Sequence, residues 1–505
     1  MKLTNSKAMR DADERAIHVL GIPSTLLMTN AARQVSEAAL ELMGKNKTTV
    51  MFCGSGNNGG DGIGAAVHLL RRGVAIRCFL VGERSKMTED CSEMERRLVE
   101  LGGKLEDFNP EDARINELAN EAGVLIDALF GIGLNSNLRG KALAAVKIIN
   151  EAKVPVVSAD IASGVEADSG RILGDAVRAD ITVTFSRAKI GHFAEPGCTC
   201  CGKLRIADIG IPSELLTKAE TDVFAIASED VSLPVRPRIS HKGNYGKLLI
   251  IGGSVGYTGA PVLCSLAAAR SGAGLVSLGV PSSIYGITAG RLLEPMPFPL
   301  ADDGSGRLSL EALPVIAERL EASDVGVIGC GLSRSADISA LVRNIVSTST
   351  KQLVIDADGL FALGDDPNII KAAHKAPVLT PHEGEFARLG GVLTGDRVSD
   401  ARSFAISREC VLVLKGHRTI CAFPDGEVYI MPNGNPGMSK GGSGDVLAGI
   451  IGALLGQLFQ KQAVITACAI HALAGKLCAE RFGEYALLPT DIIEAIPEIT
   501  RSITR

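Results

Sequence analysis

The chain has 505 residues and a formal net charge of -5 at pH 7, and 57 of its residues are glycine. Glycine exceeds its usual share of ~7% without a three-residue period, which excludes a collagen-like chain. A hydrophobic content of 46% excludes a disordered one. The slightly acidic balance comes with no basic stripe, so we expect no nucleic-acid partner. Aromatic residues are only 4%, and an aliphatic composition favours buried parallel strands.

The length allows two to four domains. The longest uncharged apolar run, residues 446–460, has 15 residues. A membrane-spanning helix needs ~20 residues, so we expect a buried helix and no membrane partner. Residues 1–16 are polar and charged and contain no signal-peptide core. We therefore expect a cytoplasmic protein whose 12 cysteines are thiols.

In the first half of the chain, apolar residues at helical spacing over residues 1–42 precede an alternation of strands and helices. The predicted strands are aliphatic runs at residues 48–54, 75–82, 124–131, 155–164 and 180–189. The crossovers between them are long enough for a parallel sheet. The pattern predicts a doubly wound α/β domain over residues 1–225.

Residues 229–246 contain two prolines, several charges and no periodicity, and we interpret them as a linker. The alternation then resumes, with predicted strands at residues 247–253, 275–281, 325–331, 352–359, 376–385 and 410–416. This predicts a second α/β domain over residues 226–505, so that the chain forms two three-layer αβα domains. Ligands of open parallel sheets bind at the C-terminal strand ends, so the residues after these strands are the candidates for function.

The loop after the first predicted strand reads GSGNNGGDG, residues 54–62. Glycines let a backbone turn tightly and approach a ligand, and the N–H groups that open a helix suit a phosphate. A generic dinucleotide-binding turn explains the glycines equally well. Asn57 and Asn58 add oxygen acceptors that such turns lack.

Asp127 and Asp160 lie at the ends of two further predicted strands. An aspartate flanked by apolar residues at a strand end is normally hydrogen-bonded and structural, and that interpretation stays open. In a parallel sheet, however, both would lie at the same edge as Asn58. Asn58, Asp127 and Ser163 would offer oxygen ligands to a hard cation. Asp160 would then be left for proton transfer.

The motifs GSGNNGGDG, DALFGIGL, SADIASGV, DSGRILGDAVRADITVTF and KIGHFAEPG make residues 1–220 resemble the NAD(P)HX epimerase family, the YjeF N-terminal domain. That family is Rossmann-like and interconverts the R and S forms of hydrated NADH and NADPH, called NADHX and NADPHX, at C6. The resemblance implies that Asp160 is the acid/base and that Asn58, Asp127 and Ser163 bind potassium. The implied substrate-binding residues are Asn57, Asn58, Gly59, Gly60, Asp61, Gly131, Ile132, Gly133, Leu134, Asn135, Ser136, Asn137 and Asp160.

Two positions depart from this family pattern. Ala162 replaces the proline of D-I-P-S-G, and Asn137 replaces the proline of P-L-R-G. The first change removes a φ restraint beside Ser163 but no ligand atom. We therefore expect epimerase activity to be preserved.

In the second half, the motif GGSGD, residues 441–445, opens the long apolar run. Consecutive small residues at a helix N-terminus aim backbone N–H groups at one point and so form an anion hole. Asp445 beside it can take a proton from a hydroxyl while a phosphoryl group is stabilised. Taken alone, a capped helix with an aspartate in its first turn explains the motif equally well.

The run NPGMSKGGSGDVLAGIIGALLG resembles the ribokinase-like superfamily, and within it the ADP-dependent NAD(P)HX dehydratases, the YjeF C-terminal domain. The motifs NYGKLLIIGGSVGYTGAPVL, VIGCGLS, VIDADGL, LTPHEGE and VLKG extend this resemblance over residues 236–500. It implies a repair reaction in which ADP phosphorylates the C6 hydroxyl of the S form. Phosphate then leaves, and NAD(P)H is regenerated with AMP and phosphate as the other products.

The same resemblance assigns Asp445 as the base and magnesium as the metal, with Asp356 and Glu385 near it. The other implied residues are Gly442, Ser443 and Gly444 in the anion hole, Lys415, Gly416, His417, Arg418, Thr419 and Gly444 for the adenine nucleotide, and Ala260, Gly331, His382 and Asp445 for the hydrated cofactor. Two departures stand out. Cys330 replaces the proline of G-P-G-L-G, and Lys440 places a cation near the expected phosphates.

The two halves together predict a bifunctional enzyme, an NAD(P)H-hydrate epimerase and an ADP-dependent (S)-NAD(P)H-hydrate dehydratase. Its partners would be the small molecules NADHX, NADPHX and ADP, and by family analogy we expect a homo-oligomer. The alternative is a small-molecule kinase of the vitamin-precursor type with a non-catalytic nucleotide-binding N-terminal domain. A kinase would form a stable phosphate ester from ATP without dehydration.

Overall fold

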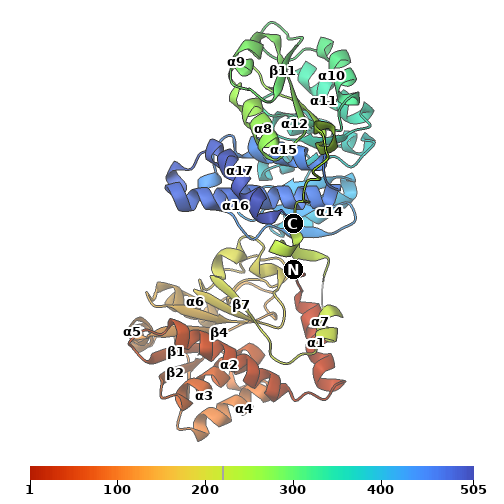
Figure 1. Cartoon of the computed structure of the whole chain (residues 1–505). Coiled ribbons are helices and arrows are strands. Elements are labelled where there is room, and N and C mark those ends of the chain that lie inside the picture. The colour runs from red at the N-terminus through yellow and green to blue at the C-terminus, as the bar shows by residue number, and fades with distance from the viewer. Residues whose placement is uncertain (219–220, 505) are drawn as a thin grey trace. The chain divides into compact units, whose positions relative to one another are not determined.

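The computed structural model describes residues 1–218 and 221–504. The chain divides into two compact units, Lys2–Val223 and Phe224–Arg505, the second of which includes Met1. In each unit, helices cover both faces of a sheet (Figure 1). The predicted α/β class with largely parallel sheets is confirmed.

The N-terminal sheet has seven strands among the described residues, in the order β3-β2-β1-β4-β5-β6-β7. Neighbouring strands are parallel throughout this order. The strands are β1 (Thr48–Cys53), β2 (Ala75–Leu80), β3 (Leu105–Asp107), β4 (Val124–Ala128), β5 (Val156–Ala159), β6 (Ile181–Phe185) and β7 (Lys203–Ala207). The order reverses between β1 and β4, which is where a doubly wound sheet binds its ligand.

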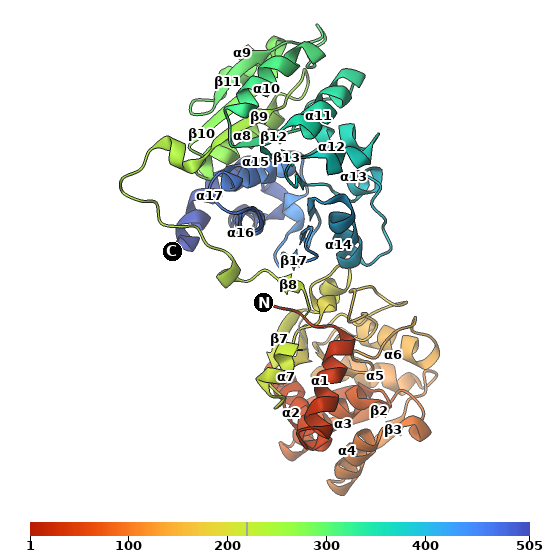
Figure 2. The same cartoon turned by 90° about the vertical axis from the view of Figure 1, so that its right-hand side faces the viewer.

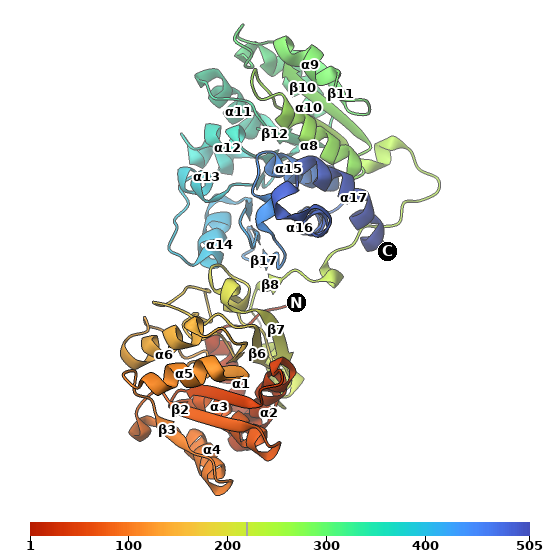
Figure 3. The same ribbon diagram turned by 90° about the vertical axis from the view of Figure 1, so that its left-hand side faces the viewer.

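Hydrophobic clusters lie on both faces of this sheet, beneath the helices that Figure 3 shows covering it. Met51 and Cys53 of β1 pack into one layer, whereas Val50 and Phe52 pack into the other, as the two-residue period of a strand requires. The helices of the first layer are α1 (Ser6–His18), α2 (Ser24–Leu42), α3 (Asn57–Arg71) and α4 (Glu89–Glu100), and those of the second are α5 (Ala113–Glu121) and α6 (Gly140–Glu151).

The C-terminal sheet has ten strands in the described part of the chain, in the order β11-β10-β9-β12-β13-β14-β15-β16-β17-β8. The strands from β11 to β15 pair in parallel, and β16 and β17 are antiparallel additions. The bounds are β8 (Val223–Ala225), β9 (Lys247–Ile251), β10 (Leu275–Pro281), β11 (Met296–Leu300), β12 (Val325–Ile328), β13 (Gln352–Ile355), β14 (Val378–Leu379), β15 (Val411–Leu414), β16 (Ile420–Ala422) and β17 (Val428–Ile430).

The largest core cluster of this unit joins the sheet to four helices, α8 (Gly259–Arg270), α15 (Ser443–Leu455), α16 (Gln460–Ala486) and α17 (Pro489–Ile503). The opposite face carries α10 (Leu313–Glu321), α11 (Ala336–Thr348), α12 (Asp358–Leu363), α13 (Glu383–Arg388) and α14 (Arg397–Arg408), as Figure 2 shows. The run at 446–460, predicted as a buried helix, is the buried helix α15 only as far as Leu455; the remainder is a turn in which Phe459 is 92% exposed.

One helix of the described residues, α16, is long and apolar enough to cross a membrane by composition, and 67% of its most apolar window is buried inside the protein. All 12 cysteines are buried, and no disulfide joins them in the described part of the chain.

Candidate active sites

The polar residues predicted at strand ends meet where the N-terminal sheet reverses its order. Asp127 lies near the end of β4, Asp160 directly follows β5, and Asn57 and Asn58 open α3. Beside them is a cavity of about 990 Å³ whose lining includes Asn57, Asn58 and Asp160. The residues that were predicted at strand ends therefore lie around one cavity.

Glycines allow the loop that opens α3 to pack tightly. A methyl group on Gly59 would lie 1.8 Å from the carbonyl oxygen of Gly54, and one on Gly54 would lie 2.1 Å from that of Leu129. A methyl group on Gly60 would lie 2.7 Å from the sulfur of Met28. Gly54 and Gly59 thus allow the backbones of the loop, of α3 and of the end of β4 to pack closely against one another.

Asp160 is the most constrained residue of this site. It is buried and has a φ of 63°, a left-handed conformation that is rare outside glycine. Its Oδ1 accepts a hydrogen bond from the Nζ of Lys189 at 2.5 Å, and Lys189 is itself 1% exposed. The Lys189 ammonium also donates to the Thr184 hydroxyl at 2.8 Å and to the Phe185 carbonyl at 3.2 Å. All three donors of the ammonium are therefore used inside the protein.

His192 holds the backbone of Asp160 in place. Its Nδ1 accepts from the backbone N–H of Lys189 at 3.0 Å, so the proton of the neutral ring is on Nε2. Nε2 then donates to the carbonyl oxygen of Asp160 over 2.9 Å. Burial lowers the pKa of His192 to about 4, which keeps the ring neutral at physiological pH.

Three carboxyl groups of this site differ in their pKa. Burial acts to raise the pKa of Asp160, but the Lys189 ion pair outweighs it and lowers that pKa, so Asp160 is ionised. Burial, with a contribution from Asp160, raises the pKa of Asp61 well above its usual value. Burial also raises the pKa of Asp13, on α1, to about 6 against the opposing effect of Lys189, so Asp13 is mostly ionised at neutral pH. Asp160 as a proton acceptor and Asp61 as a proton donor thus line one cavity.

Of the residues predicted to bind potassium, Asp127 and Ser163 are hydrogen-bonded to each other and Asn58 lines the cavity. Asp127 is fully buried and accepts from the Ser158 hydroxyl at 2.8 Å and from the Ser163 backbone N–H at 2.9 Å. The Ser163 hydroxyl lies 3.0 Å from the backbone N of Phe130. Both polar atoms of the Asn58 amide are buried without a hydrogen-bond partner in the described part of the chain. An unsatisfied buried amide oxygen is a feature that a bound cation would explain.

The structure separates the other predicted epimerase residues into two groups. Those that line the cavity are Asn57, Asn58, Asp61, Gly131, Ile132, Gly133, Leu134 and Asp160. Gly59 and Gly60 instead pack inside the unit, and Asn135, Ser136 and Asn137 are exposed on the far part of their loop.

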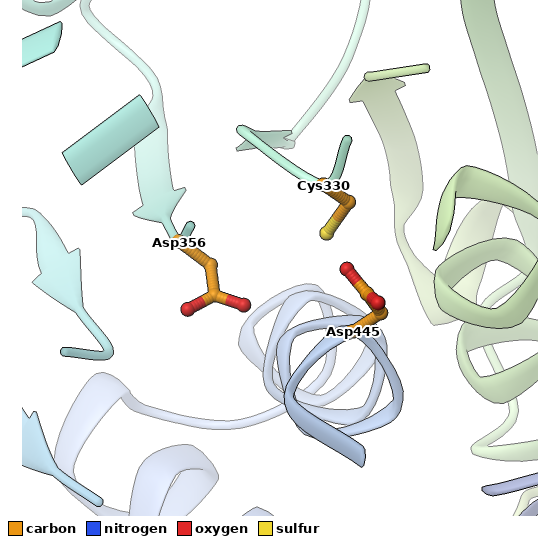
Figure 4. A group of neighbouring side chains, drawn as sticks. All are labelled: Cys330, Asp356 and Asp445. Atoms are coloured by element: carbon orange, nitrogen blue, oxygen red, sulfur yellow. The ribbon is translucent and has the colours of Figure 1, made fainter. Parts of the chain in front are cut away.

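In the C-terminal unit, Asp445 lies in the first turn of α15 beside two other reactive side chains. The Cys330 Sγ and carboxylate oxygens of Asp356 and Asp445 lie within 4.8 Å of one another. Figure 4 shows the three side chains pointing into one space from the ends of β12 and β13 and from α15. Burial and the Asp356 charge raise the pKa of Asp445 to about 6, with Cys330 and Lys415 opposing them. Asp445 is therefore ionised at neutral pH but poised to accept a proton.

Lys415, predicted to bind the nucleotide, lies close to both carboxylates that were predicted near magnesium, Asp356 and Glu385. Its Nζ donates to Asp356 Oδ1 at 2.8 Å and lies 3.7 Å from Glu385. Burial acts to lower the pKa of Lys415, but the two carboxylates outweigh it and raise that pKa, so the lysine is charged. A methyl group on Gly444 would lie 3.3 Å from this Nζ. The lysine charge is thus beside the N-terminus of α15.

That helix N-terminus is only partly available to an anion, because the Ser443 N–H donates to the Lys440 carbonyl at 3.3 Å. Gly442 caps it with a φ of 105°, and no side chain makes a cap hydrogen bond to it. The first N–H groups of a helix have no intrahelical partner, so they can serve a bound anion. The predicted nucleotide loop 415–419 reaches this helix start through Lys415, whose Nζ would lie 3.3 Å from a methyl group on Gly444. The rest of the loop packs against residues 431–434, where Met431 N–H donates to the Thr419 carbonyl at 2.8 Å.

The remaining predicted residues differ in exposure and in whether they face the site. Gly331 follows β12 with a φ of 68°, and a methyl group on it would lie 3.2 Å from Ala260. His382 caps α13, with its Nδ1 accepting from Gly384 N–H at 3.0 Å, and its side chain is 61% exposed. Lys440 does not point into the anion hole. Its Nζ donates to the carbonyls of Tyr485 and Leu487 at 2.7 and 2.6 Å.

The carboxylates near Lys415 each have one oxygen already engaged within the protein. Asp356 Oδ1 already accepts from Lys415 and, at 2.7 Å, from Thr380. Glu385 accepts from the His382 backbone N–H at 2.9 Å. The cluster of Cys330, Asp356 and Asp445 includes a thiol, whereas magnesium demands oxygen ligands in octahedral geometry.

Two family models match the chain. The model described as NAD(P)H-hydrate dehydratase matches residues 248–498, and the model described as YjeF-related protein N-terminus matches residues 24–191. The chain is 39% identical to the bifunctional NAD(P)H-hydrate repair enzyme of Moorella thermoacetica, over 100% of this chain and 97% of the relative. It is 36% identical to that of Thermofilum pendens, again over 100% and 97%. The chain belongs to the family of bifunctional NAD(P)H-hydrate repair enzymes.

Among solved structures, the chain is similar to a ribokinase-like superfamily protein from Enterococcus faecalis. The identity is 26% and the TM-score is 0.50, over 56% of this chain and 97% of that chain. The predicted family and the ribokinase-like fold of the C-terminal half are confirmed.

Sequence reasoning missed three residues of this repair-family chain that the structure places at its sites. Lys189 was within the motif KIGHFAEPG, but only the fold reveals its ion pair with Asp160. Asp13 gave no signal beyond its place on an amphipathic helix, yet it lines the cavity. Cys330 was noted as a departure from the family pattern, but its contact with Asp445 depends on the packing of β12 against α15.

Proposed function

We propose that residues 1–225 epimerise NADHX and NADPHX and that residues 226–505 dehydrate the S forms at the expense of ADP. The observation that carries this proposal is the match to bifunctional repair enzymes along the whole chain. Each half also presents one aspartate beside a glycine-rich helix start, the buried Asp160 and the partly buried Asp445. The two activities complement each other, because the dehydratase accepts one C6 form and the epimerase supplies it from the other.

In the epimerase half, we assign Asp160 as the group that exchanges a proton with the C6 hydroxyl. Its ion pair with Lys189 keeps it ionised inside a buried site, which supports the role of a base. The loop at Asn57–Asp61 and residues 131–137 would hold the hydrated cofactor. Their glycines let backbone approach the ligand closely.

Potassium fits the donor set beneath that cavity. Asn58 Oδ1, a carboxylate oxygen of Asp127 and the Ser163 hydroxyl would hold the ion, and the orphaned Asn58 amide supports this assignment. When bound, the ion would supply positive charge close to the substrate. Burial now raises the pKa of Asp127, and a cation would favour its ionised form.

In the dehydratase half, we assign Asp445 as the base that removes the proton of the C6 hydroxyl. The hydroxyl oxygen then attacks the terminal phosphorus of ADP, and the bond to the AMP oxygen breaks. Gly442, Ser443 and Gly444 would stabilise the transferring phosphoryl group through backbone N–H groups, with Lys415 adding charge. Phosphate leaves from C6 and a proton from C5, which restores the double bond.

Residues 415–419 would bind the adenine nucleotide, and Ala260, Gly331 and His382 would contact the hydrated cofactor. Magnesium would enter with the nucleotide phosphates, as it commonly does, because Asp356 and Glu385 are already engaged. A cytoplasmic location and a homo-oligomeric state remain predictions.

One assay tests both halves. The chain is incubated with a mixture of R and S NADHX, ADP, magnesium and potassium, and the recovery of NADH is followed by absorbance near ~340 nm. We expect full recovery from the wild type, recovery that stops at the share of the S form from Asp160→Asn, and none from Asp445→Ala. Wild-type rates in either variant would refute the corresponding assignment. A stable phosphate ester formed from ATP would favour the kinase alternative.

A further inference from the structure

Arg397 is a buried arginine of the C-terminal unit to which the proposed function gives no role. It is the first residue of α14, and only 6% of it is exposed. Burying a guanidinium costs free energy unless opposite charges and hydrogen-bond acceptors compensate for it. The groups that surround this guanidinium therefore show what it holds in place.

One partner of Arg397 is the start of the proposed nucleotide loop 415–419. Its Nη2 donates to the carbonyl oxygen of Lys415 at 3.2 Å. A methyl group on Gly416 would lie 2.5 Å from Nη2, 2.7 Å from Nη1 and 3.0 Å from Cζ, so the guanidinium lies directly against the glycine backbone. Glycine is the residue that permits so close an approach. Arg397 thus supports the backbone of two residues that are proposed to bind ADP.

The other partner belongs to the segment that is proposed to contact the hydrated cofactor. Arg397 Nε lies 3.0 Å from Glu383 Oε1 and forms an ion pair with it. Glu383 directly follows His382, the residue that caps α13. The two segments also meet through their backbones, since Lys415 N–H donates to the Pro381 carbonyl at 2.8 Å. One guanidinium therefore contacts both a nucleotide segment and a cofactor segment.

The shape of an arginine side chain suits this bridging position. A guanidinium holds its N–H donors in one fixed plane, so a single group can serve the Lys415 carbonyl and the Glu383 carboxylate together. A lysine ammonium is a compact charge without this fork. The bridge therefore depends on arginine itself and not only on a positive charge.

We propose that Arg397 is a positioning residue of the dehydratase site, which holds the nucleotide loop and the segment at His382 in one arrangement, so that ADP and the hydrated cofactor bind in register for phosphoryl transfer. This inference rests on the proposed function, because the roles of both segments come from it. Arg397 is assigned no contact with either ligand. Its effect on the reaction passes through Lys415, Gly416 and His382.

The test is the steady-state kinetics of ADP-dependent dehydration of (S)-NADHX by the full chain. Arg397→Met removes the charge and the donors but keeps much of the volume. We expect it to raise the KM for ADP and the KM for (S)-NADHX by about tenfold each, the order of magnitude for losing one hydrogen bond from a charged group. Arg397→Lys keeps the charge without the fork, and its KM values should lie between those of wild type and Arg397→Met.

The KM values separate positioning from a loss of folded protein. A smaller folded fraction lowers kcat alone, because the molecules that remain folded bind both substrates as the wild type does. KM values within about twofold of wild type in both Arg397 variants would overturn the inference. A rise in only one of the two KM values would also overturn it, because the arginine would then support one segment and not both.

Gly416→Ala disturbs the same contact from the other side. Its methyl group must displace the guanidinium, so we expect a higher KM for (S)-NADHX, a substrate to which Gly416 itself is not assigned. In the Arg397→Met background the same substitution should raise that KM no further, because the contact is already lost. Fully additive effects on the free energy of binding would contradict a shared contact.

Arg402→Met is the matched control. Arg402 lies on the same helix, and its Nε donates to the carbonyl of Gly426, in the turn between β16 and β17, at 2.9 Å. We expect both KM values of this variant to match wild type, and an equal rise in them would overturn the inference. A wild-type chain that does not dehydrate (S)-NADHX with ADP would refute the proposed function instead, so the two failures are distinguishable.

Discussion

Each unit pairs a lysine with a buried aspartate, fully buried Lys189 with Asp160 and partly exposed Lys415 with Asp356, but the two pairs act differently. Lys189 contacts Asp160 itself and keeps that residue ionised. Lys415 contacts Asp356, and Asp445 next to it is left with a raised pKa of about 6. The first arrangement suits a carboxylate that must stay charged inside a cavity. The second suits a base that must accept a proton readily during phosphoryl transfer.

His192 is expected to make the N-terminal unit sensitive to acid. Its folded pKa is about 4 against an ordinary 6.5, so the unfolded chain binds more protons between these values and stability falls as pH falls. Asp13 acts in the opposite direction, because its folded pKa is raised to about 6. Between pH 6.5 and pH 5, the free energy of unfolding should therefore fall by about 2 kcal/mol less in His192→Gln than in the wild type.

The measurement is urea unfolding of the full chain at each pH, read by pulse proteolysis at sites within Lys2–Val223. At pH 7.5 the variant should be less stable by about 1–2 kcal/mol, because it disturbs the hydrogen bonds to Lys189 N–H and Asp160 O. Parallel stability curves for variant and wild type would show that His192 does not titrate in this range.

At the residue scale, sequence reasoning finds the residues that end a buried strand or open a helix. Asp127, Asp160 and Asp445 were recognisable because a polar residue interrupts an aliphatic run. Lys189 was not, since its side chain turns back to a residue 29 positions earlier in the chain. The Asp445 contact of Cys330 likewise depends on two elements that are distant in sequence. Such pairings follow from the fold and leave no local pattern.

At the scale of elements, the central strands were predictable and the edge strands were not. β1, β4, β5 and β12 are buried along their length and read as continuous aliphatic runs. The edge strands β7 and β11 are partly exposed, and β11 contains two prolines, which only an edge strand tolerates. The β16–β17 hairpin has a turn signal, Asp425-Gly426, that would have located it.

The start of α3 offers a test of the tight loop. In Gly59→Ala the new methyl group would lie 1.8 Å from Gly54 O, so the helix and the loop must separate. We expect a loss of about 1–3 kcal/mol in the stability of the N-terminal unit. The KM for NADHX epimerisation should rise by about tenfold or more, because the displaced loop carries Asn57 and Asn58.

Gly56→Ala is the control within the same loop. A methyl group there meets no atom within 4 Å, and the φ of -89° is ordinary for alanine. Its stability should match wild type within about 0.5 kcal/mol. Dehydration of (S)-NADHX is a second control on the same molecule and should be unchanged in both variants. Equal stabilities for Gly59→Ala and Gly56→Ala would contradict the close approach.

At the scale of the whole molecule, the two units differ in which cation their residues suit. The N-terminal unit has the unsatisfied amide of Asn58 and the oxygen atoms of Asp127 and Ser163, a donor set that suits potassium. The carboxylates of the C-terminal unit are held by Lys415, Thr380 and a helix cap. The two activities of one chain should therefore respond differently when potassium is withdrawn.

Recovery of NADH from mixed NADHX epimers resolves the two responses in a single trace. The S form present at the start is consumed in a first phase limited by the dehydratase, and the R form follows in a phase limited by the epimerase. Replacing potassium with tetramethylammonium, at constant ionic strength and magnesium, should slow the second phase by about tenfold or more. The first phase should stay within about twofold, because no potassium ligand is assigned to that unit. A rate measured without the chain gives the spontaneous epimerisation to subtract.

Asn58→Ala should reproduce the slow second phase even with potassium present, since it removes the amide that is left without a partner. If potassium slowed or accelerated both phases alike, the ion would act outside the residues assigned to it.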